Sequence, residues 1–164
     1  MAFLITLSPE AWTQSLDEKL DGFYEHPEWL ISPRALMDSL EADKKVYLLD
    51  SRQRAEYRVS HIPGALRVDY EGFEPKQVSE VPQDALVVVY CTVGWRSERV
   101  TGRLREAGYE RSYNLYGSIL AWSNHGFALE NKRGQSTQRV HTYSRSWSAY
   151  LEQGQPVYDW WKMW

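Results

Sequence analysis

The sequence predicts an α/β fold, with a parallel sheet covered by helices on both faces. Short apolar segments alternate along the chain with segments whose apolar residues recur at helical spacing. The strongest apolar segment, residues 87–90, has three consecutive valines and no polar face, which is typical of a strand buried on both sides. Strands that alternate with helices favour parallel pairing, because each connection lays a helix on the sheet.

Local patterns place the individual elements. Ser32 and Pro33 are a good start for a helix, with serine as N-cap and proline at the first helical position. Residues 97–107 have helical spacing, and Gly108 stands where a C-terminal cap belongs. We expect further strands over 46–49 and 112–116, a short strand after a turn at 61–65, a loop with a weak helix over 69–84, and a final helix over 118–124.

Cys91 follows the central apolar segment, and a loop of six residues, 91–96, is expected to join it to the next helix. Gly94 can adopt the positive φ that such a loop tends to need, and Arg96 adds a positive charge. Backbone N–H groups and the dipole at the helix N-terminus would lower the thiol pKa from about 8.5. We therefore predict that Cys91 is a reactive nucleophile acting on small anions. The alternative is that Cys91 is a small buried apolar side chain.

Three motifs give the sequence a resemblance to a known family. The loop Cys91-Thr92-Val93-Gly94-Trp95-Arg96-Ser97 resembles the C-x-x-G-x-R-S active-site loop of the rhodanese-like sulfurtransferases. Residues 48–52, with Glu56-Tyr57 and His61-Ile62-Pro63-Gly64-Ala65, are similar to that family's D-x-R…E-[FY]…G-H-I-P-G-A signature. Residues 114–119, with Ala121-Trp122 and Gly126, resemble its L-x-G-G-[IL]-x-x-W segment. The resemblance covers residues 32–129, the size of one rhodanese domain, and implies a five-stranded parallel sheet.

The resemblance also implies a sulfurtransferase activity and a set of site residues. Cys91 would attack the outer sulfur of a thiosulfate-like donor, carry it as a persulfide, and pass it to a thiophilic acceptor such as cyanide or a thiol. The backbone N–H groups of the loop would hold the persulfide, and the reaction requires no metal and no organic cofactor. The residues implied in substrate binding are Thr92, Val93, Gly94, Trp95 and Arg96, of which Arg96 would hold the anionic donor or steady the loop. Asp50, Arg52 and Ser97 are expected to support the site.

Four positions depart from the family pattern. Thr92 stands where the family often has a basic residue, and Trp95 is bulky for its place in the loop. Tyr116 precedes Gly117 where a second glycine is usual, and Ser60 stands where glycine is common. None of these changes removes the nucleophile, but the first two leave the identity of the sulfur donor open.

Composition excludes several other classes of protein. The 164 residues suit one domain, and 43% hydrophobic with 25% charged residues is ordinary for a soluble globular protein. The net charge of −3 argues against a general nucleic-acid binder. A single cysteine excludes an internal disulfide, a dithiol mechanism and a zinc site of several cysteines. The four histidines have no metal-ligand spacing, so no metal site is expected.

The two ends of the chain are expected to lie outside the rhodanese-like unit of residues 31–130. Residues 1–30 begin with a short apolar segment, 2–7, and are expected to pack on the core. No apolar run approaches the length of a membrane span, so a cytoplasmic location is expected. Residues 131–138 are polar and predict a linker, and the remaining tail to residue 164 holds half of the eight tryptophans. The tail either buries its aromatic rings against the domain, which we favour, or presents them to a protein partner or a second copy of the chain.

Two other functions stay open on the sequence. The first is a non-catalytic interaction or sulfur-relay module that works through the aromatic tail. The second, less favoured, is a phosphatase or arsenate reductase, whose loops need five residues between cysteine and arginine. Here Cys91 and Arg96 have four residues between them, which favours sulfur chemistry.

Overall fold

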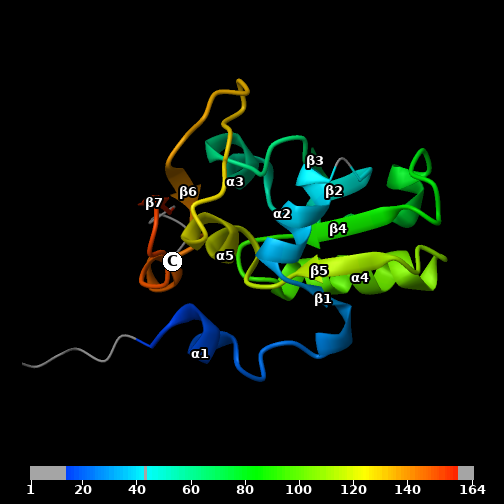
Figure 1. Ribbon diagram of the computed structural model, residues 1–164, viewed down its shortest axis with the longest axis horizontal. Helices are drawn as coiled ribbons and strands as arrows, with labels where there is room; N and C mark the ends of the chain where they lie inside the picture. The colour runs from blue at the N-terminus through cyan, green and yellow to red at the C-terminus, as the bar shows by residue number, and fades with distance from the viewer. Residues whose placement is uncertain (1–13, 43, 159–164) are drawn as a thin grey trace, which may run out of the picture.

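The computed structural model describes residues 14–42 and 44–158, and its centre is a five-stranded sheet (Figure 1). The strand order is β1-β5-β4-β2-β3, and every neighbouring pair is parallel. The predicted α/β class and the parallel five-stranded sheet are therefore confirmed. The strands are β1 (Leu30–Ile31), β2 (Val46–Asp50), β3 (Leu66–Arg67), β4 (Leu86–Tyr90) and β5 (Ser112–Leu115).

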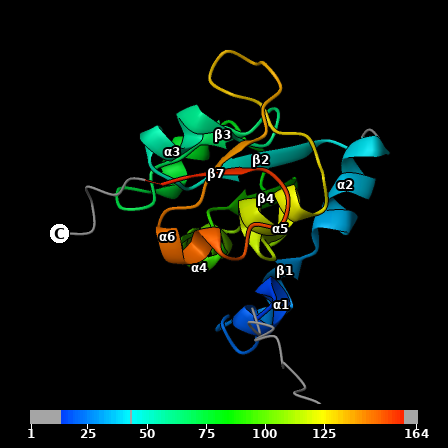
Figure 2. The same cartoon turned by 90° about the vertical axis from the view of Figure 1, so that its left-hand side faces the viewer.

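Side chains alternate between the two faces of the sheet, and each face buries a separate hydrophobic cluster. On one face, Val88 packs with residues of the helices α2 (Pro33–Glu41) and α5 (Ser118–Asn124). On the other face, Val87 and Val89 pack with residues of α4 (Trp95–Glu106). These valines are at most 1% exposed, which explains why the segment has no polar face. Helices thus cover both faces, as predicted (Figures 1 and 2).

The helix after β4 begins earlier than the sequence suggested. It starts at Trp95 and not at Ser97, so the loop after the strand is 91–94 and the six-residue loop was wrong. The N-cap of this helix is Gly94 in a left-handed conformation, which lacks the capping side chain that marks a helix start in sequence. Ser97, a favourable N-cap residue type, lies inside the first turn. The end of the helix follows prediction, because Gly108 has a φ of +95° just beyond it.

The remaining elements surround the sheet. Ser32 caps α2 as predicted, because its hydroxyl accepts the backbone N–H of Ala35 at 3.1 Å. Leu16 and Leu20 of the first helix are buried in the same cluster as α2, whereas the apolar segment 2–7 lies outside the described residues. None of the helices described has the length and hydrophobicity needed to cross a membrane. The other elements outside the tail are α1 (Leu16–Leu20), η1 (Pro27–Trp29), α3 (Arg54–Val59) and η2 (Pro75–Val78).

The described part of the C-terminal tail folds back onto the domain. It forms β6 (Arg139–His141), α6 (Arg145–Ser148) and β7 (Gln155–Val157), with β6 and β7 paired in parallel (Figure 2). Val140 is fully buried in the core, and Trp147 and Tyr150 pack against the same cluster. The Asn124 side chain, at the end of α5, donates to the Tyr150 carbonyl at 2.9 Å and accepts the backbone N–H of Glu152 at 2.8 Å. The favoured packing of the tail is thus present over β6–β7, whereas the last three tryptophans lie outside the described residues.

Candidate active site

Cys91 lies directly after the central strand β4, at the carboxyl edge of the sheet. Because all five strands are parallel, the residues that follow neighbouring strands meet at this same edge. Asp50 ends β2, and the turn from β5 into α5 contains Gly117 and Ser118. The edge therefore collects three segments that are far apart in the sequence around one thiol.

The Cys91 thiol is surrounded by hydrogen-bond donors and by one cation. The backbone N–H of Gly94 donates to Sγ at 3.2 Å, and the side chain is 1% exposed. Burial alone raises the pKa of a thiol, but the Arg96 guanidinium and hydrogen bonds from Ser97 and Gly94 outweigh it, so the pKa of Cys91 is lowered. A lowered pKa favours the thiolate, which is the nucleophilic form of cysteine.

Gly94 is required at its position for two independent reasons. Its φ is +109°, which L side chains rarely adopt, and a Cβ built there would lie 2.5 Å from Cε1 of Tyr24. The Tyr24 hydroxyl donates to the Val93 carbonyl at 2.7 Å and accepts the backbone N–H of Gly117 at 2.9 Å. Burial raises the pKa of Tyr24. Tyr24 therefore clamps the loop to the turn before α5, and no local sequence pattern distinguishes it from the other aromatic residues of its segment.

Arg96, Thr92 and Glu56 form one network beside the thiol. Arg96 donates from Nη1 to Oε2 and from Nη2 to Oε1 of Glu56, each at 2.8 Å, and from Nη2 to the Thr92 hydroxyl oxygen at 2.9 Å. Burial would raise the pKa of Glu56, but the bonds and charge of Arg96 dominate and lower it to about 2. Of the two roles expected for Arg96, holding the donor or steadying the loop, these contacts favour the second. Glu56, which the motif contained, is thus a supporting residue of the site.

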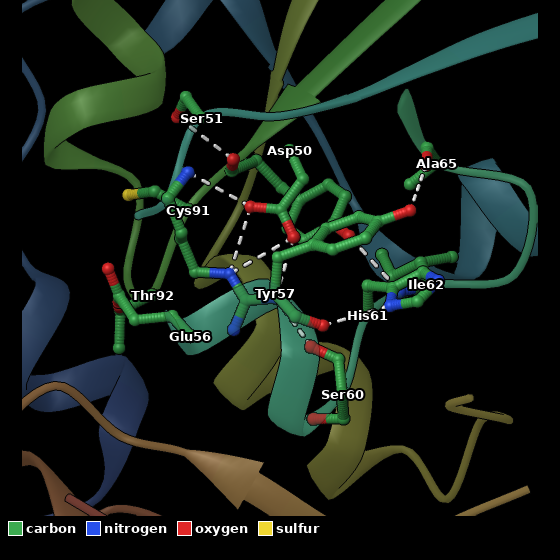
Figure 3. A network of polar contacts seen from close by, with 12 residues as sticks. Asp50, Ser51, Glu56, Tyr57, Ser60, His61, Ile62, Ala65, Cys91 and Thr92 are labelled. Atoms are coloured by element: carbon green, nitrogen blue, oxygen red, sulfur yellow. Dashed lines mark hydrogen bonds and ion pairs between the residues drawn. The ribbon is translucent and has the colours of Figure 1, made fainter. Parts of the chain in front are cut away.

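Asp50 and Arg52 form a buried ion pair, and Figure 3 shows the network of polar contacts around Asp50. The guanidinium donates to the carboxylate from Nε at 2.9 Å and from Nη2 at 2.6 Å, and Nη2 also donates to the Ser60 carbonyl at 2.7 Å. Both side chains are fully buried. In Figure 3 the sulfur of Cys91 points away from this network. Through the bond to Ser60, the pair connects the end of β2 to the residue that follows α3, and its supporting role in the site stays a prediction.

Ser97 supports the loop from inside α4. Its hydroxyl donates to Oδ1 of Asn114 at 2.7 Å, and the Asn114 amide donates to the Gly94 carbonyl at 3.0 Å. The chain of bonds connects the helix, the strand β5 and the end of the loop. Asn114 was part of a sequence motif but was given no role there.

The turn before α5 shows where the family's second glycine is missing. Gly117 and Ser118 are both left-handed, with φ values of +59° and +49°. They occupy the two glycine positions of the motif L-x-G-G-[IL], which begins at Leu115. The residue that replaces the second glycine is therefore Ser118, and the expectation that it was Tyr116 was wrong by two positions. The Ser118 hydroxyl accepts the backbone N–H of Cys91 at 3.0 Å and donates to the Leu115 carbonyl at 3.2 Å. These bonds hold a non-glycine residue in a strained conformation in contact with the backbone of Cys91.

A cavity of about 660 Å³ opens above Cys91. Thr92, Val93, Trp95 and Arg96 line it, so it brings together nearly all of the predicted substrate-binding residues. Gly94 is next to it and donates to the sulfur instead. Asp50, Arg52 and Ser97 do not line it. In the described parts of the chain, no group of three histidine, cysteine or acidic side chains is arranged to hold a metal ion.

Fold and site together define an α/β protein with a candidate cysteine nucleophile at the carboxyl edge of a parallel sheet. A family model described as a rhodanese-like domain matches residues 32–125, and the chain belongs to this family. A sulfurtransferase of Allochromatium vinosum is 36% identical over 104 residues, which are 63% of this chain and 96% of that protein. A rhodanese-like domain protein of Staphylococcus aureus has a similar structure, with a TM-score of 0.56 and 26% identity over 63% of this chain and 97% of that one.

Other relatives are longer proteins with different names. A probable adenylyltransferase/sulfurtransferase MoeZ of Mycobacterium tuberculosis is 33% identical over 57% of this chain but only 24% of its own length. A tRNA uridine(34) hydroxylase of Streptococcus thermophilus is 36% identical over 56% of this chain and 29% of its own length. The matched unit therefore occurs within proteins that carry different names. Membership in the family identifies the fold of this chain but does not specify the reaction.

Proposed function

We propose that this protein is a sulfurtransferase that carries sulfane sulfur as a persulfide on Cys91. The observation that carries the proposal is that Cys91 lines the cavity, with the Gly94 N–H donating to Sγ at 3.2 Å and the pKa of the thiol lowered. The same donors that favour a thiolate would also stabilise the terminal anionic sulfur of a persulfide.

In the first half of the reaction, the Cys91 thiolate attacks the outer sulfur of a thiosulfate-type donor. A sulfur–sulfur bond forms to Cys91 as the sulfur–sulfur bond of the donor breaks. Sulfite leaves with the electron pair of that bond, and the enzyme keeps a negatively charged persulfide. No proton, metal ion or outside oxidant is needed to balance this step.

In the second half, a thiophilic acceptor attacks the outer sulfur of the persulfide. With cyanide, a carbon–sulfur bond forms, thiocyanate leaves, and the Cys91 thiolate is regenerated. With a thiolate acceptor, the product is the persulfide of the acceptor. The loop would contribute its backbone N–H groups, and Arg96 would keep the loop in place through Glu56.

We also propose a division of the chain that goes with this function. Residues 31–130 are the rhodanese-like unit, residues 1–30 pack on it, and residues 131–164 are a linker and an aromatic extension. The burial of Leu16 and Leu20 supports the packing of the N-terminal segment, and the burial of Val140 supports that of the extension.

The direct test is the intact mass of the protein after incubation with thiosulfate, beside the Cys91→Ser variant. We expect the wild-type protein to gain the mass of one sulfur atom and to lose it again when cyanide is added. The variant should fold and should show neither change. Sulfur transfer by Cys91→Ser, or no sulfur on the wild-type protein with any sulfane donor, would refute the proposal.

The geometry gives less support to a phosphatase. Such an enzyme needs an arginine free to hold a tetrahedral oxyanion, whereas both terminal nitrogens of Arg96 already donate to Glu56. We expect no release of phosphate from a generic aryl phosphate ester. A non-catalytic interaction module would instead leave Cys91 unreactive toward all sulfane donors, which the mass measurement detects.

A further inference from the structure

The cavity above Cys91 is walled by aromatic side chains that come from both ends of the chain. Phe23 belongs to the N-terminal segment and Trp147 to α6, and their rings meet edge to face with centroids 6.2 Å apart. Across the cavity lining, Tyr70 and Trp95 form a second pair with centroids 5.8 Å apart. Neither Phe23 nor Trp147 lies within the residues matched by the family model, 32–125. The wall is thus partly built by segments outside that match.

Tyr143 is a further aromatic residue of this wall, and its backbone is in a strained conformation. It also lies outside the family match, lines the cavity, and is a non-glycine residue with a φ of +67°. Its ring lies against Arg96, with the guanidinium carbon 5.3 Å from the ring centroid. Its backbone N–H donates to Nδ1 of His141 at 3.2 Å, which helps to fix the turn. Strained residues of this kind concentrate at functional sites.

The exposed aromatic surface of Tyr143 is also unusual within this protein. Among the described residues, three large hydrophobic side chains are exposed: Leu66 at 56%, Trp95 at 44% and Tyr143 at 54%. The two aromatic ones line the cavity over Cys91, and Leu66 does not. Apolar surface that is kept in contact with water beside a nucleophile is typical of a binding site.

A small inorganic dianion would leave most of the cavity unfilled. Its volume of 660 Å³ is that of roughly twenty water molecules at about 30 Å³ each, several times what thiosulfate fills. The charge of Arg96 is already paired with Glu56, and Thr92 is bonded to both. Arg54 and Arg67 supply positive charge elsewhere on the lining, and Arg67 lies 3.7 Å from Asp69. The cavity thus offers an aromatic surface that thiosulfate would leave uncovered, and two of its cations are paired with carboxylates.

From this wall we infer that the preferred sulfur donor is an organic sulfane anion with an aromatic body, of the arenethiosulfonate class. This inference rests on the proposed function. The aromatic ring would lie against Tyr143, Trp147 and Trp95, with the sulfonyl group between the ring and the loop. The Cys91 thiolate attacks the terminal sulfur, the sulfur–sulfur bond of the donor breaks, and the arenesulfinate leaves with the electron pair. Charge and atoms balance as they do for thiosulfate.

The test compares benzenethiosulfonate with thiosulfate as donors, with cyanide as acceptor and thiocyanate as the measured product. We expect kcat/KM to be at least about tenfold higher for benzenethiosulfonate, which corresponds to one stacked ring. Tyr143→Ala should reduce this ratio on the order of tenfold, and Tyr143→Phe should keep it. Leu66→Ala removes an equally exposed apolar side chain outside the cavity and should leave the ratio unchanged.

Binding of the leaving groups separates failure of this inference from failure of the proposed function. Calorimetric titration should give benzenesulfinate a dissociation constant at least about tenfold below that of sulfite, and Tyr143→Ala should remove the difference. Tight benzenesulfinate binding without sulfur transfer would overturn the sulfurtransferase but keep the aromatic site. Equal binding of the two leaving groups, equal kcat/KM for the two donors, or a ratio unaffected by Tyr143→Ala would overturn the aromatic site.

Discussion

Arg96 and Glu56 are joined by two hydrogen bonds of 2.8 Å, in which Nη1 donates to Oε2 and Nη2 donates to Oε1. Glu56 is 1% exposed in its side chain, and Arg96 is 14% exposed. The pair ties the first turn of α4, beside the candidate nucleophile, to the first turn of α3. Through this pair the protein holds a positive charge near Cys91 that is matched by a carboxylate, and this charge lowers the pKa of the Cys91 thiol.

Removing Arg96 is expected to raise the pKa of Cys91, because its guanidinium is the main charge that counters burial. A single Arg96→Gln variant would strand the Glu56 carboxylate, so the change is made in Glu56→Gln/Arg96→Gln. The rate of thiol alkylation by iodoacetamide, measured against pH, should move to higher pH. Arg99→Gln removes a neighbouring cation of α4 and should not move the curve. An unchanged curve in the double variant would contradict the assigned cause.

Glu56 should make the stability of the protein depend on acid pH. Its pKa is lowered from 4.5 to about 2 in the folded protein, so the unfolded chain binds the proton first as pH falls. The stabilisation is complete above pH 4.5 and is lost toward pH 2; at this shift it amounts to about 3 kcal/mol. Urea unfolding at several pH values should therefore show that the difference between wild type and Glu56→Gln shrinks on acidification. A constant difference would refute this linkage.

Gly94→Ala should destabilise the protein through both strain and collision. The left-handed φ costs roughly 1–2 kcal/mol, and the new Cβ would also lie 2.5 Å from the Tyr24 ring. Gly64→Ala is the matched control, because Gly64 has a φ of +78° but nothing within 4 Å of its built Cβ. The free energy of unfolding should fall further for Gly94→Ala than for Gly64→Ala. In a Tyr24→Leu background, Gly94→Ala should lower the free energy of unfolding by less than it does in the wild-type protein. If it lowers the free energy by the same amount in both, the Tyr24 ring is not the cause.

The buried Asp50–Arg52 pair should be far more sensitive than an exposed one. Asp50→Asn leaves the fully buried guanidinium without its counterion, which is expected to cost about 3–5 kcal/mol. Asp69→Asn breaks the exposed contact with Arg67 at 3.7 Å and should cost at most about 1 kcal/mol. Both free energies come from urea unfolding followed by circular dichroism. Similar values for the two variants would remove the bracing role of Asp50.

Several features could be predicted because each is encoded within a few neighbouring residues. The valines of β4 leave no polar face, which predicts a buried strand, and Ser32 with Pro33 predicts the start of α2. Gly108 similarly marks the end of α4. The beginning of α4 was misplaced by two residues, because Gly94 caps it through backbone conformation and offers no capping side chain to recognise.

The sequence by itself determined the α/β class, the alternation of strands and helices that makes the sheet parallel, and the place of Cys91 directly after a buried strand. Only the tertiary structure decided what surrounds the thiol. Tyr24 and Val93 are 69 residues apart, Glu56 and Arg96 are 40 apart, and Tyr143 reaches the same cavity from the tail. Hydrophobic periodicity and turn residues act locally and are visible in sequence. The residues that contact one another in the site are brought together by packing at the carboxyl edge of the sheet. They share no sequence pattern that could have paired them in advance.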